Sequence, residues 1–145
     1  MNFAMSPNLL NDWTVLVVDD EPDSIEVVRT LLELCGARVI TADNGETGFI
    51  EAKQNRPDFI ISDLSMPGVS GWEMLERLKT ELSTQQIPII ALTAHAMDGD
   101  RNRAIAAGFH NYLSKPLEPE TFVSDLLGLL VDVPNIAKLL NREQG

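Results

Sequence analysis

The sequence has little cysteine and no long hydrophobic run, and both absences exclude broad classes of protein. The single cysteine, Cys35, cannot form an internal disulfide, and no signal-type segment precedes Trp13. A reducing, cytoplasmic setting is therefore expected. The longest apolar stretches, VLVV and IPIIAL, are far shorter than the ~20 residues that a membrane helix requires, so we expect no membrane insertion.

Basic residues are also scarce. Eleven Lys and Arg residues stand against 22 Asp and Glu residues in a chain of 145, which gives a net charge of −11 at pH 7. Nucleic-acid phosphates repel such a chain, so direct nucleic-acid binding is disfavoured. The remaining composition, 44% hydrophobic and 23% charged, is typical of one globular domain of ordinary size.

From Thr14 onward, short apolar runs alternate with longer segments of helical periodicity. This alternation is typical of a parallel sheet with helices on both faces. The expected strands are residues 14–19, 37–42, 58–63, 87–93 and 110–113. A helix is expected after each strand, and the residues that signal the five helix starts are Pro22, Asn44, the capping box of Ser70 and Glu73, Asp98 and Pro119.

Apolar residues at helical spacing predict the inward faces of these helices. The expected stripes are Trp72, Leu75, Leu78 and Leu82 in the third helix, and Phe122, Leu126, Leu129 and Leu130 in the last. The pattern predicts an α/β fold with a doubly wound, five-stranded parallel sheet, in the flavodoxin-like order 2-1-3-4-5, and five helices. Residues 13–130 form the predicted domain, flanked by an N-terminal extension (1–12) and a partly helical C-terminal extension (131–145).

Polar side chains follow the strands at their carboxyl ends, where ligands bind in open α/β sheets. They are, in chain order, Asp19, Asp20, Asp63, Thr93 and Lys115. In the predicted order the first and third strands are neighbours about 4.8 Å apart, so Asp20 and Asp63 face each other where the order reverses. Lys115 begins two strands away, roughly 10 Å, a gap that its long side chain largely covers.

Carboxylates this close repel one another, and a divalent cation removes the repulsion. Oxygen ligands with room for water suit Mg²⁺, with Mn²⁺ as an alternative ion. With the Lys115 ammonium and the Thr93 hydroxyl nearby, the Asp63 carboxylate has the surroundings of a nucleophile for phosphoryl transfer. Taken singly, each residue has an ordinary structural interpretation, such as a turn-forming aspartate or a strand threonine, and only the combination favours this chemistry.

Four segments, VLVVDDEPD, DLSMPGVSG, ALTAHA and YLSKP, resemble in order and spacing the receiver domain of two-component response regulators. The resemblance covers about residues 13–130. It implies that Asp63 is the phosphoacceptor and that Lys115 holds a phosphoryl oxygen. It also implies that Mg²⁺ is bound directly by Asp20, Asp63 and the backbone carbonyl of Ser65, and through water by Asp19.

The same resemblance implies a conformational switch. Thr93 would turn inward, Tyr112 would fill the vacated space, and the face made by the fourth helix, fifth strand and fifth helix would change its binding surface. By the same resemblance, Ser65 and His95 would occupy the two positions that commonly tune how fast water removes the phosphate. The resemblance further implies a cis peptide bond between Lys115 and Pro116.

The function that the sequence favours is a stand-alone, phosphorylation-activated receiver, a switch rather than a turnover enzyme. The expected partners are a sensor histidine kinase or phosphotransfer protein and a downstream protein target, and the extensions leave a homodimer open. Residues 131–145 are too few for an output domain, so output through a partner is expected. A phosphorelay intermediate carrier and a receiver fragment of a hybrid kinase remain alternatives.

Two functions outside the family are disfavoured. An aspartate-dependent phosphatase or mutase carries a second aspartate two residues after its nucleophile, where this chain has Ser65. A flavodoxin-like flavin or nucleotide carrier needs a loop of backbone donors after the first strand, where the segment DDEPD presents carboxylates.

Overall fold

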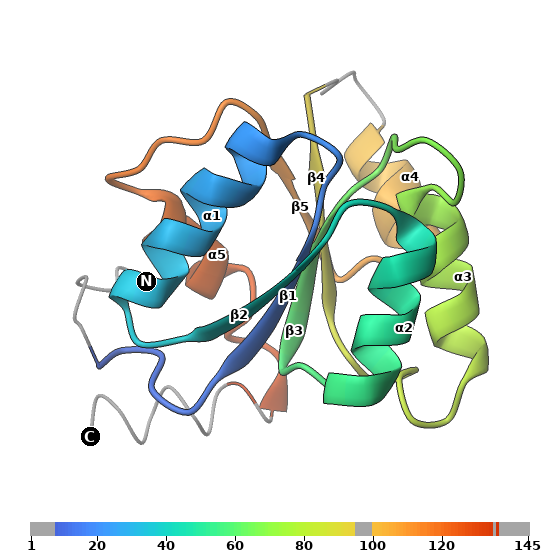
Figure 1. Ribbon diagram of the computed structural model, residues 1–145, viewed down its shortest axis with the longest axis horizontal. Helices are drawn as coiled ribbons and strands as arrows, with labels where there is room; N and C mark the ends of the chain where they lie inside the picture. Colours follow the sequence, from blue (N-terminus) through green and yellow to red (C-terminus); the bar gives the residue numbers. More distant parts are fainter. Residues whose placement is uncertain (1–7, 95–99, 135, 137–145) are drawn as a thin grey trace.

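The described residues, 8–94, 100–134 and 136, contain one five-stranded parallel sheet in the predicted order, β2-β1-β3-β4-β5. Figure 1 shows this computed structural model. The strands are β1 (Thr14–Val18), β2 (Arg38–Ala42), β3 (Phe59–Asp63), β4 (Ile89–Thr93) and β5 (Asn111–Ser114). The helices are α1 (Pro22–Leu34), α2 (Gly45–Asn55), α3 (Gly71–Thr80), α4 (Asp100–Ala107) and α5 (Phe122–Gly128).

Helices cover both faces of the sheet. α1 and α5 lie on one face, and α2, α3 and α4 lie on the other (Figure 1). Successive strand residues point to opposite faces, so Val15 and Val17 belong to the hydrophobic cluster under α1 and α5, whereas Leu16 and Val18 belong to the cluster under α2 and α3. Because both faces are covered, the central strands β1, β3 and β4 are largely apolar and buried, whereas the edge strands β2 and β5 carry polar residues. Among the helices described, none offers the apolar length that a bilayer crossing requires.

Local sequence signals fix where the helices begin. Pro22 is the first residue of α1, and the Asn44 side chain accepts a hydrogen bond from the Thr47 N–H at the start of α2. Ser70 and Glu73 form the predicted capping box at the start of α3. The predicted cap of the fourth helix, Asp98, and also His95 lie outside the described residues.

The inward face of α3 differs from the prediction at one position. α3 ends at Thr80, because Glu81 adopts an extended conformation with φ −99° and ψ 130°. Leu82 therefore lies beyond the helix and is 86% exposed, so its predicted place in the stripe is wrong. Met74, which the stripe omits, is fully buried instead.

The last helix starts later than predicted. α5 begins at Phe122 rather than at Pro119. The Glu118 carbonyl accepts hydrogen bonds from the N–H groups of Thr121 and Phe122, so a turn precedes the helix. Of the predicted stripe, Phe122, Leu126 and Leu130 are buried, the last of them beyond the end of α5, whereas Leu129 is only partly buried.

Both flanking segments pack against the core in their described parts. Leu10 is fully buried, and its N–H donates to the Cys35 carbonyl at 2.7 Å. Ile136 is 2% exposed and joins the same hydrophobic cluster. Pro134 and Ile136 have helical conformation, and most of the predicted partly helical extension lies outside the described residues. The hydrophobic core thus extends past the ends of the sheet.

Leu10→Ala should lower the free energy of unfolding by about 2–5 kcal/mol, because it removes a fully buried side chain and leaves a cavity. The matched control, Leu82→Ala, removes the same atoms from an exposed side chain and should change stability by less than about 0.5 kcal/mol. Urea denaturation of the two variants measures the difference. Equal stabilities would show that the N-terminal segment contributes nothing to the core.

Candidate functional site

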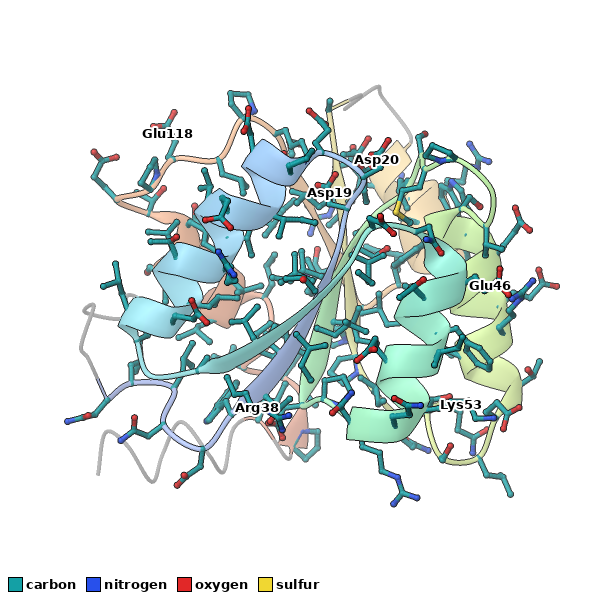
Figure 2. The ribbon with its side chains drawn as sticks, viewed as in Figure 1. Asp19, Asp20, Arg38, Glu46, Lys53 and Glu118 are labelled. Atoms are coloured by element: carbon teal, nitrogen blue, oxygen red, sulfur yellow. The ribbon has the colours of Figure 1, made fainter. Side chains whose placement is uncertain are left out.

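The pairing of β1 with β3 brings two predicted site residues together. Val18 pairs with Ser62, so Asp19, the next residue, lies beside Asp63 at the end of β3. Asp19 and Asp63 are buried, at 1% and 6% exposed. In Figure 2 the labelled Asp19 and Asp20 lie together at the edge of the sheet where β1 ends. The prediction names Asp20 as the residue that faces Asp63, whereas in the structure Asp19 lies beside Asp63 and Asp20 follows as the exposed member.

Thr93 and Lys115 come from β4 and the segment after β5. Thr93, which is buried, pairs with Ser114, and its backbone carbonyl accepts a hydrogen bond from the Lys115 N–H at 2.8 Å. Tyr112 lies on β5, half-buried, and packs against the cluster under α2 and α3. The peptide bond between Lys115 and Pro116 is cis, as the resemblance implies.

Asp19, Asp20 and Asp63 form a carboxylate cluster. One ligand oxygen of each lies within 4.8 Å of the corresponding oxygens of the other two. Asp20 is exposed, whereas Asp19 and Asp63 are buried. An all-oxygen set that is open on one side fits Mg²⁺, which binds through carboxylates and keeps several water ligands. The donor chemistry of the cluster therefore agrees with the predicted ion.

Backbone N–H groups orient two of these carboxylates. Asp19 Oδ1 accepts a hydrogen bond from the Glu21 N–H at 2.9 Å, and Asp63 Oδ1 accepts one from the Ser65 N–H at 3.2 Å. Burial raises the pKa of Asp19, and the charge of Asp63 adds to the rise. The Glu21 N–H and Lys115 act in the opposite direction without cancelling it.

Lys115 places an ammonium group among the acids. Its Nζ lies 2.8 Å from Glu21 Oε1, 2.9 Å from Asp19 Oδ2 and 3.2 Å from Asp63 Oδ2. Partial burial alone would lower the pKa of Lys115, but the hydrogen bonds to Glu21 and Asp19 and the charges of Asp19 and Asp63 raise it above its ordinary value. The lysine therefore stays charged and offsets the repulsion within the cluster.

Glu21 is a site residue that the sequence analysis missed. Its position at the start of α1 indicates only a helix-start acid. Nothing in the sequence pattern shows that its side chain reaches Lys115, which is 94 residues away in the chain. Lys115 in turn lowers the pKa of Glu21, through a hydrogen bond and its charge.

Gly71 allows the start of α3 to approach the site. A Cβ atom at this position would lie 2.1 Å from the Asp63 carbonyl oxygen and 3.0 Å from Leu64 Cα. The Gly71 N–H also donates to the Leu64 carbonyl at 3.1 Å. Any side chain here would push against the backbone that carries Asp63.

Gly71→Ala should lower the free energy of unfolding by about 1–3 kcal/mol, because the new methyl group overlaps backbone atoms that cannot move without shifting β3. The control is Gly128→Ala, where a Cβ meets nothing within 4 Å and alanine should be neutral or stabilising by up to about 1 kcal/mol. Thermal denaturation compares the two. Unchanged stability in Gly71→Ala would contradict the tight approach.

The chain matches the family model described as "Response regulator receiver domain" over residues 15–127. Polar-differentiation response regulator DivK of Brucella anthropi is 35% identical over 119 residues, covering 82% of this chain and 97% of DivK. The structure of chemotaxis response regulator CheY4 of Vibrio cholerae has a TM-score of 0.76 at 31% identity, covering 81% of this chain and 98% of that one. The receiver domain of sensor histidine kinase PA1611 from Pseudomonas aeruginosa, solved with a magnesium ion in its active site cleft, has a TM-score of 0.72 at 30% identity, covering 82% and 94%.

Proposed function

The chain belongs to the response regulator receiver domain family, and on this premise we propose that Asp63 accepts a phosphoryl group from the phosphohistidine of a kinase or phosphotransfer protein. One observation carries the assignment: Asp63 ends the central strand β3 with the Lys115 ammonium 3.2 Å from its Oδ2 atom. Asp19 and Asp20 complete an acidic cluster that fits phosphorylation and Mg²⁺ binding.

The proposed reaction is an in-line displacement. A carboxylate oxygen of Asp63 attacks phosphorus, the new P–O bond forms as the P–N bond to histidine breaks, and the histidine nitrogen keeps the electron pair. Lys115 donates to a phosphoryl oxygen and stabilises the charge that gathers there. Mg²⁺, held by Asp19, Asp20, Asp63 and the Ser65 carbonyl, would supply further positive charge for the phosphoryl oxygens.

The proposal extends to Thr93 and Tyr112 as the switch residues. Thr93 is buried at the end of β4, the strand next to β3, so its side chain comes from the strand that neighbours Asp63. Tyr112 lines a hollow of about 380 Å³ together with Arg101 and Asp125, from α4 and α5. Movement of Tyr112 would reshape this hollow, which supports the α4–β5–α5 face as the surface that a downstream target binds.

A second candidate is the receiver of a hybrid kinase, which the likeness to the PA1611 receiver domain supports. The phosphoryl chemistry at Asp63 is then the same. The two candidates differ in the source of the histidine that exchanges the phosphoryl group with Asp63. In a hybrid kinase, that histidine belongs to the same signalling pathway as the kinase that carries the receiver.

The central assignment predicts the behaviour of Asp63→Asn. Incubation of the native protein with acetyl phosphate and Mg²⁺ should give a single, base-labile phosphoryl adduct in the intact mass spectrum. Asp63→Asn should give none, because an amide oxygen is too weak a nucleophile. The control Asp43→Asn, at an exposed position outside the cluster, should behave as the native protein does. An adduct on Asp63→Asn, or none on the native protein, would contradict the assignment.

A separate prediction concerns the ion. Asp20→Asn should weaken Mg²⁺ binding about tenfold or more, because it removes one charged ligand from the exposed side of the cluster. Glu46→Gln is the matched control, since Glu46 lines the same hollow as Asp20 but lies outside the cluster. Isothermal titration calorimetry with MgCl₂ measures both affinities. Equal losses in the two variants would indicate a general charge effect instead of ligation.

A further inference from the structure

The three carboxylates around Lys115 Nζ differ in how firmly they are held. The Asp19 and Asp63 side chains are 1% and 9% exposed, whereas the Glu21 side chain is 59% exposed. Asp19 is also fixed by the hydrogen bond that its Oδ1 accepts from the Glu21 N–H. Among the three partners of Lys115, Glu21 is thus the one whose side chain can rotate into the solvent at the lowest free-energy cost.

The Glu21 side chain does not cap helix α1, which begins directly after it. Glu21 is the N-cap residue of α1, a position where side chains commonly accept a hydrogen bond from the first turn. Its side chain makes no such bond, and Oε1 instead lies 2.8 Å from Lys115 Nζ. Among the described residues, the Glu21 carboxylate therefore contacts Lys115 and not the first turn of α1.

A phosphoryl group on Asp63 needs hydrogen-bond donors from the Lys115 ammonium group. An ammonium group has three N–H donors, and among the described residues three carboxylates already surround this one. The phosphoryl oxygens need at least one of these donors. The donor that faces Asp63 Oδ2 can turn directly to a phosphoryl oxygen, whereas a second donor has to come from Asp19 or Glu21. Asp19 is buried and Glu21 is exposed, so Glu21 is the group that gives up this second donor.

We propose that Glu21 is a positioning residue that holds a Lys115 donor before phosphorylation and releases it to the phosphoryl group. The inference rests on the proposed role of Asp63. Glu21 thereby competes with the phosphoryl group and favours the unphosphorylated state. Glu21 and Lys115 both line a hollow of about 490 Å³ that Ala94 also borders, so this carboxylate and the Lys115 ammonium face the same open space.

The test measures the affinity of a phosphoryl mimic. Beryllofluoride is titrated into the native protein and into Glu21→Gln at saturating Mg²⁺, with isothermal titration calorimetry as the readout. Glu21→Gln should bind beryllofluoride about two- to fivefold more tightly, the range that an exposed ion pair allows. The rate of phosphorylation by acetyl phosphate should rise by a similar factor.

Two further variants distinguish an effect of the Glu21–Lys115 contact from a general effect of removing negative charge. Asp23→Asn removes the same charge from the same hollow, but Asp23 is not one of the three carboxylates around Lys115, so its affinity should match that of the native protein. Glu21→Asp keeps the charge on a side chain one carbon shorter. It should bind more tightly than the native protein, as Glu21→Gln does. Thermal denaturation verifies that each variant is folded.

The inference is overturned if Glu21→Gln binds beryllofluoride no more tightly than the native protein. It is also overturned if Asp23→Asn matches Glu21→Gln, or if Glu21→Asp matches the native protein, since charge would then act without the contact. Failure of the native protein to take up either beryllofluoride or a phosphoryl group overturns the proposed function as well. Native uptake with equal affinities in all variants overturns only the role of Glu21.

Discussion

The acidic edge of this sheet depends on one positive charge. Two carboxylates about 5 Å apart repel by roughly 3 kcal/mol at an effective dielectric near 20. The Lys115 ammonium lies within 3.2 Å of an oxygen of both Asp19 and Asp63, and so offsets this repulsion. The same charge that makes the resting cluster stable is the one that a phosphoryl group on Asp63 would recruit. Under the proposed function, stability and phosphoryl chemistry would depend on the same side chain.

The fold positions that charge through rigid elements. Lys115 follows β5 directly, Asp63 ends β3, and β4 lies between these two strands with its core residues fully buried. Hydrophobic clusters on both faces fix the register of the strands, so the carboxyl ends keep a constant spacing. Arg38, at the start of β2, lies at the edge opposite Asp19 in Figure 2. The proposed chemistry would thus take place at the edge of the sheet that carries Asp19, away from Arg38.

The sequence predicts the parts of the molecule that follow from backbone periodicity. The strand order and the neighbourhood of Asp20 and Asp63 follow from alternating apolar runs and from the rule that ligands bind at strand ends. Leu82 is wrongly predicted because its burial depends on where the helix stops, which one extended residue decides. The contact of Glu21 with Lys115 escapes prediction because long side chains choose among many rotamers, and sequence spacing does not select one.

The most direct test of the account is a crystal structure of the protein grown with Mg²⁺ and beryllofluoride. We expect one metal ion among Asp19, Asp20 and Asp63, beryllofluoride on a carboxylate oxygen of Asp63, and Lys115 Nζ within hydrogen-bond distance of a fluorine atom. Beryllofluoride bound at another residue, or a metal ion bound away from the three aspartates, would contradict it.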